Sequence, residues 1–193
     1  QRITAINSVN KVGPFMFGYE HATNYKLTNS GEWTVLPNGD RIWRIRIKSE
    51  GALSLNFVFD DFYIPVGGHV YLYSPEKDFV LGAYTSQNNN VNNQLGTEFI
   101  KGDEAVIEYF EPKSVAGQGR LFLTMVVHGY IDVNGWYSEK VNESDPCNMD
   151  VMCPDGTPWS NEIRSVARIA SGGGLCTGTL VNNTAQDGTP YFL

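Results

Sequence analysis

Residues 41–47 are Arg-Ile-Trp-Arg-Ile-Arg-Ile, and this stretch decides the class of fold. Apolar and charged side chains alternate along it, which places Trp43, Ile45 and Ile47 on one face and the arginines on the other, solvated face. Such alternation is typical of a half-buried antiparallel strand, because successive side chains point to opposite faces of a sheet. The preceding residues 37–40, Pro-Asn-Gly-Asp, predict a tight hairpin turn. The stretch is therefore expected to be a strand of an antiparallel sheet.

The same alternation recurs along the chain up to about residue 130. Four further runs show it: Leu53 to Phe59, Val70 to Tyr73, Val106 to Phe110 and Leu121 to Val127. In the last run, one face is expected to carry Leu121, Leu123, Met125 and Val127. Glycine-containing turn signals separate the runs, and no helix is predicted among them. Short strands at this spacing predict a β-sandwich, in which two sheets bury alternate side chains against each other.

Composition excludes some classes of function. A chain of 193 residues has room for one large domain or two small ones. Its formal net charge of -7 argues against nucleic-acid binding, because no basic patch is present to neutralise phosphates. No segment is long and apolar enough to cross a membrane. We therefore expect neither a nucleic-acid partner nor a membrane span.

The cysteines are confined to the last quarter of the chain, as Cys147, Cys153 and Cys176. An odd number leaves at least one of them without a partner inside this chain. Their spacing fits no common zinc signature. One interpretation is three buried free thiols. The other depends on a resemblance of the sequence around them.

Two motifs in this last quarter carry the resemblance. Residues 147–154 are Cys-Asn-Met-Asp-Val-Met-Cys-Pro, and residues 176–183 are Cys-Thr-Gly-Thr-Leu-Val-Asn-Asn. The second motif resembles a Cys-x-Gly-[Ser/Thr]-Leu-[Val/Ile] strand at the start of trypsin-like serine protease domains. The first is similar to the mature amino terminus of bacterial lysyl-endopeptidase-like proteases. The chain thus resembles the precursor of such a protease.

The resemblance implies where the catalytic residues lie. In the family, Thr-Ala-x-His-Cys follows and carries the catalytic histidine, whereas this sequence stops at Leu193. We therefore expect a chain truncated just before that histidine, with no catalytic, cofactor-binding or metal-binding residue and no peptidase activity of its own. The resemblance also implies that the three cysteines pair with cysteines beyond the chain. Its partners would be the remainder of its own protease domain and, for the full-length enzyme, peptide or protein substrates.

The resemblance further implies a domain organisation and a location. Residues 1–130 would form the β-sandwich pro-domain, residues 131–146 a linker or processing region, and residues 147–193 the first strands of an incomplete trypsin-like β-barrel. In that last part, strands are expected at about 165–170, 175–181 and 191–193. Disulfides need an oxidising compartment, so a secreted or extracellular bacterial protein is expected, possibly one held at the cell surface.

Lys140 is the only basic residue of the polar connection. The family typically cleaves itself after lysine, so the resemblance makes the bond between Lys140 and Val141 a candidate processing site. An exposed polar stretch of this kind is cleavable. The alternative is an ordinary linker lysine.

Other polar residues give only general hypotheses. The three histidines, His21, His69 and His128, are far apart and are more typical of surface or structural residues than of a metal site. The acidic pairs 60–61 and 103–104 are expected in solvated turns rather than around calcium, which needs more oxygens from one loop. No cofactor is predicted. The alternative function is a non-catalytic β-sandwich binding module of a secreted or surface protein.

Overall fold

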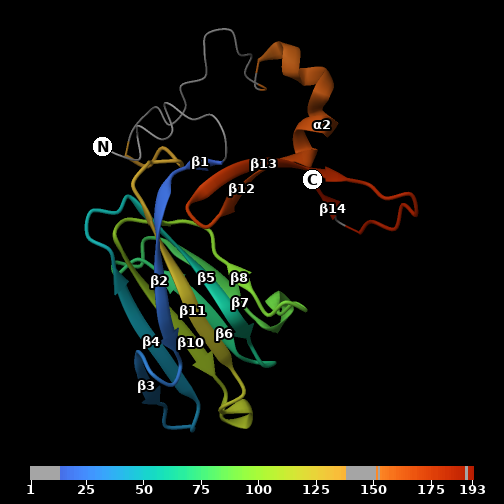
Figure 1. The fold of residues 1–193 in the computed structure, drawn as a ribbon. Helices are drawn as coiled ribbons and strands as arrows, with labels where there is room; N and C mark the ends of the chain where they lie inside the picture. The colour runs from blue at the N-terminus through green and yellow to red at the C-terminus, as the bar shows by residue number, and fades with distance from the viewer. Residues whose placement is uncertain (1–13, 138–150, 152, 190) are drawn as a thin grey trace.

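The computed structural model describes residues 14–137, 151, 153–189 and 191–193 (Figure 1). It is mostly strand. The sheets are antiparallel, and the described strands form no closed barrel. None of the helices in the described ranges is long and apolar enough to span a membrane.

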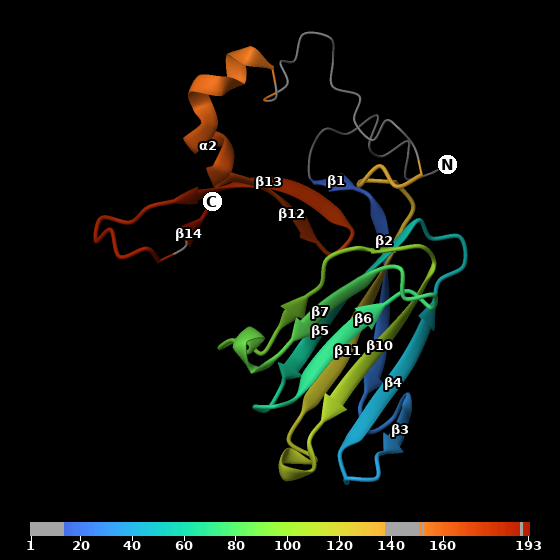
Figure 2. The ribbon, with the colours of Figure 1, turned by 180° about the vertical axis from the view of Figure 1, so that it is seen from behind.

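The first sheet has five antiparallel strands. Their order is β3 (Glu32–Val35), β4 (Arg41–Lys48), β10 (Glu104–Glu111), β6 (His69–Tyr73) and β7 (Val80–Tyr84). Figure 2 shows β4, β10 and β6 side by side in one layer. The predicted strand at 41–47 is thus present, and it pairs with β10 along its whole length.

The second sheet is built around β5 and β11. It contains β2 (Gly18–Lys26), β11 (Arg120–Gly129), β5 (Ser54–Tyr63) and β8 (Leu95–Gly96), with β9 (Ile100–Lys101) also paired to β5. Helical structure in residues 14–137 is limited to two short 3₁₀ turns, η1 (Ser86–Asn88) and η2 (Lys113–Val115). This agrees with the prediction of strands without helices.

Both sheets contribute to one buried cluster of apolar side chains. The first sheet provides Trp43, Leu72, Ile107 and Tyr109, and the second provides Leu55, Phe57, Phe59, Phe62 and Leu123. Burial of these large side chains stabilises each sheet against the other, since each fully buried aliphatic or aromatic side chain contributes about 1.5–3 kcal/mol. The alternating runs read from the sequence are the source of most of this cluster.

The prediction that the arginines of β4 lie on the solvated face is wrong for Arg41. Arg41 stands two residues before Trp43, so both side chains are on the same side of the strand. It lies directly opposite Glu111, whose side chain is 1% exposed. The more exposed Arg44 pairs instead with Glu108, at 2.6 Å. The alternation of side chains along β4 therefore places Arg41 at the edge of the core.

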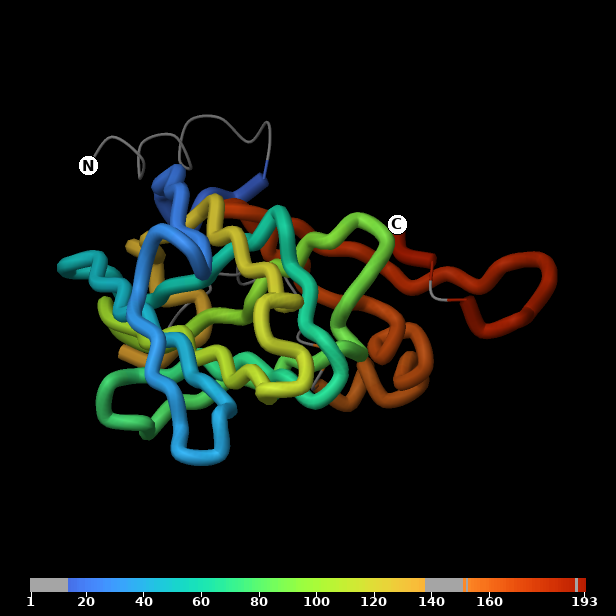
Figure 3. Tube along the Cα trace, turned by 90° about the horizontal axis from the view of Figure 1, so that it is seen from below, coloured from blue at the N-terminus to red at the C-terminus, as the bar shows by residue number. Residues whose placement is uncertain are grey.

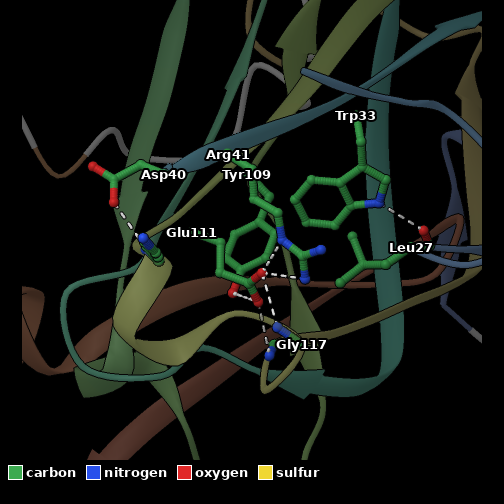
Figure 4. A network of polar contacts seen from close by, with 9 residues as sticks. Leu27, Trp33, Asp40, Arg41, Tyr109, Glu111 and Gly117 are labelled. Carbon is green, nitrogen blue, oxygen red and sulfur yellow. Dashed lines mark hydrogen bonds and ion pairs between the residues drawn. The ribbon is translucent and has the colours of Figure 1, made fainter. Parts of the chain in front are cut away.

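Glu111 is a buried carboxylate with a full set of donors (Figure 4). Its Oε2 accepts from Arg41 Nε at 2.5 Å and from the N–H of Gly117 at 3.0 Å. Its Oε1 accepts from the hydroxyl of Tyr109 at 3.0 Å and from the N–H of Gly119 at 3.2 Å. Burial, together with the charge of Glu111, raises the pKa of Tyr109, which keeps this phenol protonated as a donor. The network fixes the loop after β10 to the sheet.

The prediction for β11 is wrong in its second half. Leu121, Leu123 and Val126 belong to the main cluster, whereas Met125 and Val127 pack in a second, smaller one. The cause is a register shift between residues 123 and 125, which is present in the pairings with both β2 and β5. An irregularity of this kind reverses the facing of every later side chain, because the period of a strand is two.

A third sheet joins the two ends of the described chain. Its strands are β1 (Phe15–Met16), β13 (Gly174–Val181) and β12 (Val166–Ser171), and β14 (Tyr191–Phe192) pairs with the end of β13. Figure 3 shows the loop between β13 and β14 projecting away from the two larger sheets. The three strands expected near the end of the sequence are all present.

A helical segment precedes β12 and was not predicted. It consists of the 3₁₀ helix η3 (Pro154–Trp159) and the α-helix α2 (Ser160–Ser165). Each is too short for a helical period of apolar side chains to be recognised in the sequence.

Candidate functional site

The β12–β13 hairpin contains one of the predicted site residues. Cys176 lies in β13 and Cys153 lies directly before η3; both are exposed and free in the structure. The interpretation as buried thiols therefore does not fit these two cysteines. Cys147, Lys140 and Val141 lie outside the described residues, so the processing site and the disulfide pairing stay predictions.

The hairpin is closed by a two-residue turn. Its register runs from Val166 opposite Thr179 to Ser171 opposite Gly174, which leaves Gly172 and Gly173 at the tip. Gly172 has a positive φ of 54°, a conformation that glycine adopts without the steric cost of a Cβ. Gly172 and Gly173 therefore form the tight turn between the two strands.

The tip of this hairpin contacts the beginning of the described chain. β1 pairs antiparallel with β13, with Phe15 opposite Leu175 and Met16 opposite Gly174. The backbone of Gly173 then bonds the residues that follow β1. Its carbonyl accepts from the N–H groups of Phe17, at 2.8 Å, and Gly18, at 3.1 Å. Residues about 155 positions apart in the sequence are thus held together by main-chain hydrogen bonds.

Two charged side chains hold the hairpin at separate points. Glu20 of β2 accepts a hydrogen bond on Oε1 from the N–H of Gly173, at 2.9 Å. Arg168 of β12 donates to the carbonyl oxygen of Val133 at 2.8 Å and to Oδ1 of Asn134 at 2.7 Å. Hydrogen bonds with one charged partner are stronger than neutral ones, and a planar guanidinium that reaches two acceptors also sets orientation.

Phe17 is the apolar centre of the same contact. Its side chain is 0% exposed and forms a cluster with Val127 and Val133, against which Leu175 of β13 packs. Its ring also meets the edge of the Phe99 ring, with centroids 5.0 Å apart. The hairpin thus closes over an aromatic anchor that comes from the other end of the chain.

A serine and a histidine meet where the end of β4 approaches β11. Ser49, directly after β4, is hydrogen-bonded through its Oγ to Nδ1 of His128 at 2.7 Å. His21, on the neighbouring strand β2, has its ring centroid 6.2 Å from that of His128. Burial and the charge of His21 lower the pKa of His128, and Asp103 opposes them. Asp103 acts on His128 through its charge, and the hydrogen bond with Ser49 fixes the orientation of the ring.

His69 lies in the first sheet, whereas His21 and His128 lie on adjacent strands of the second. In the described ranges, no three side chains of the histidine, cysteine, aspartate or glutamate type lie close enough to hold a metal ion. His69 is stacked on Phe110, with ring centroids 4.8 Å apart, and its partial burial lowers its pKa. These positions fit the interpretation of structural histidines.

The expectation of solvated turns is wrong for Asp60 and Asp61, which lie within β5 because this strand continues beyond them to Tyr63; Asp103 lies directly before β10, and Glu104 begins that strand. Asp61 forms an ion pair with Arg120 at 2.9 Å, and Asp60 accepts from the side-chain amide of Gln94 at 3.1 Å. Glu104 pairs with Arg46 across β10 and β4. Glu111 is one carboxylate that the sequence did not indicate. Its alternation with Ala105, Ile107 and Tyr109 along β10 was the signal that could have found it.

One comparison with known proteins bears on the hairpin. Residues 141–193 match the family model described as lysyl endopeptidase, C-terminal domain. This part of the chain is similar to the C-terminal domain of lysyl endopeptidase. The matched range contains η3, α2 and the strands β12, β13 and β14. The match supports a protease-related protein. No solved structure was found to match the chain.

Proposed function

We propose that this chain is the amino-terminal part of the precursor of a secreted serine endopeptidase. Residues 1–130 act as its pro-domain, with the two large sheets as a sandwich, and residues 147–193 provide the first strands of a trypsin-like barrel. In the full-length protein a serine, activated by a histidine that an aspartate orients, hydrolyses peptide bonds by acyl transfer. The observation that carries the proposal is the lysyl-endopeptidase match over residues 141–193.

The arrangement of the last three strands supports this proposal. β12, β13 and β14 follow one another in the chain and pair in that order, as successive strands of an antiparallel barrel do. Val166, Leu180 and Phe192 are exposed apolar side chains on these strands. Further strands of a barrel would cover such side chains, since a barrel is packed only when all its strands are present.

The exposed cysteines are consistent with the same proposal. Cys153 and Cys176 are accessible to partners from the remainder of a protease domain. Disulfides formed in that way would require an oxidising compartment and hence secretion. The bond between Lys140 and Val141 is the proposed processing site, and the family match begins directly after it, at residue 141.

The proposal is tested by extending the reading frame and assaying the longer product. We expect Thr-Ala-x-His-Cys shortly after Leu193 and Gly-Asp-Ser-Gly-Gly further on, and we expect the secreted product to hydrolyse a lysyl ester. The purified 193-residue chain should not hydrolyse that ester. A longer sequence without these motifs would contradict the proposal and favour the non-catalytic binding module. Hydrolysis by the 193-residue chain itself would contradict the assignment of the triad to the downstream part.

A further inference from the structure

We propose that the glycine turn of the β12–β13 hairpin is a recognition element. It is bound by β1 and β2, and this contact keeps residues 14–137 docked on the hairpin after the connection between them has been cut. We call the contact the seam; its members are Phe15–Glu20, Val133 and Asn134 on one side and Arg168 and Gly172–Leu175 on the other. The proposal rests on the proposed function only in assuming that the connection is cut.

The need for glycine at the turn comes from the seam and not from the hairpin alone. Only Gly172 has a positive φ in this turn. A Cβ on Gly173 would nevertheless overlap the carbonyl oxygen of Gly18, and a Cβ on Gly172 would overlap the carboxylate of Glu20. On Gly174, a Cβ would lie 3.2 Å from the Cβ of Pro14. Gly173 is the position where glycine is needed most, because the atom that its Cβ would overlap belongs to the backbone, whereas the Glu20 side chain can move away from a Cβ on Gly172.

The backbone N–H and carbonyl of Gly173 both form hydrogen bonds with residues of the seam. Its carbonyl accepts from Phe17 and Gly18, and its N–H donates to Glu20. A turn residue of an isolated hairpin would give these groups to water. Here the N–H and the carbonyl of Gly173 are both bonded by residues of β2 and the segment before it. These residues therefore bind the main chain of the turn, as a partner does in recognition by strand addition.

Arg168 makes the contact specific in orientation. It projects from β12, whereas Gly173 lies at the end of the hairpin, so the two points of attachment are separated along the hairpin. Val133 and Asn134, which accept its two hydrogen bonds, follow β11. Phe17 lies in the buried cluster with Val133 and Leu175. Two polar attachments around one apolar anchor resemble the layout of a protein–protein interface, with its buried centre and polar rim.

The test cuts the chain within the connection and asks whether the pieces stay together. A recognition sequence for a specific protease is introduced between residues 138 and 146, and the cut protein is examined by size-exclusion chromatography. We expect the two pieces to co-elute. Gly173→Ala is expected to weaken their association about tenfold or more. The added Cβ overlaps the carbonyl oxygen of Gly18, and the shift that relieves this overlap breaks the hydrogen bond to the charged Glu20, a loss of that magnitude. Gly96→Ala is the matched control, since a Cβ there meets no atom within 4 Å.

Arg168 provides an independent variant on the other side of the seam. Arg168→Ala should weaken the association, and Arg168→Lys should restore it only in part, because an ammonium lacks the planar fork that reaches both acceptors. The control is Arg164→Ala in α2, an exposed arginine close by in the sequence. Wild-type pieces that separate, or Gly173→Ala pieces that associate as tightly as wild type, would overturn the proposal.

Hydrogen exchange on the uncut protein distinguishes docking from general unfolding. In Gly173→Ala the amides of Phe17 and Gly18, which donate to Gly173, should exchange faster. The amide of Phe57, which donates to Thr97 Oγ1 within the main core, should keep its protection. Unchanged exchange at Phe17 and Gly18 would contradict the proposal. None of these measurements requires peptidase activity, so a failure of docking leaves the proposed function open to its own test.

Discussion

Arg41 and Glu111 lie directly opposite each other on β4 and β10, and both belong to the core-facing set of their strands. Their side chains meet at 2.5 Å, and the guanidinium also stacks over the ring of Trp33, with its carbon 4.1 Å from the ring centroid. An ion pair at the edge of a core is stable only when its remaining polar atoms are satisfied. The hydroxyl of Tyr109 and two loop N–H groups meet that requirement.

Glu111→Ala is therefore expected to destabilise the fold strongly. The change leaves Arg41, Tyr109 and the N–H groups of Gly117 and Gly119 without their acceptor, and breaking a buried pair in this way costs about 3–5 kcal/mol. The free energy of unfolding is measured by urea denaturation. The control is Asp61→Ala, which removes the exposed ion pair with Arg120 and should cost about 1 kcal/mol or less. Equal losses in both variants would contradict the structural role of Glu111.

His128 should make stability depend on pH. Burial is the main cause that lowers the pKa of His128, and the charge of His21 is the second, so the folded protein favours the neutral imidazole. Below the ordinary histidine pKa of about 6.5, the unfolded chain therefore binds more protons at His128 than the folded protein does. The free energy of unfolding decreases as the pH falls through this range. In His128→Asn, urea denaturation should show a smaller loss of unfolding free energy between about pH 7.5 and pH 5 than in wild type. The same loss in both proteins would refute the assignment to His128.

Cys153 and Cys176 should react quickly with a thiol reagent in the native 193-residue chain, because both are exposed and free. Alkylation followed by peptide mass spectrometry measures each site separately. In the longer secreted protein of the proposed function, the same cysteines should react only after reduction. Protection of either thiol in the native 193-residue chain would conflict with the exposed positions.

The proposed processing site predicts a defined new amino terminus. Amino-terminal sequencing of the mature form of the longer protein should start at Val141, and Lys140→Gln should abolish this start, because lysine would be the residue recognised for cleavage. Lys113→Gln, a change in η2, serves as the control and should leave processing intact. A mature protein that begins elsewhere would refute this site.

Several elements of the fold could be predicted because their signal is local. β4, β6 and β10 carry an alternation of apolar and polar residues that any single strand reveals. β2 was missed because it lies at the edge of its sheet and most of its side chains are exposed, so it lacks the alternation. The register shift in β11 was missed because it depends on the two neighbouring strands.

The candidate site also contains features that the sequence predicts and contacts that it does not predict. The strand containing Cys176 and the glycine turn before it are local motifs, so they could be assigned from a few adjacent residues. What the turn touches could not be predicted, since Glu20 and Gly173 are 153 positions apart. No pattern within either segment indicates that the two meet.

The amino-acid sequence by itself determined the class of fold, the position of most core strands and the resemblance of the last quarter to a protease. These properties depend on side-chain alternation and short motifs, which are encoded over a few neighbouring residues. Only the tertiary structure decided that Arg41 belongs to the core edge with Glu111, and that the glycine turn is held by Phe17, Gly18 and Glu20. Those roles depend on burial and close approach, which arise only when distant segments pack together.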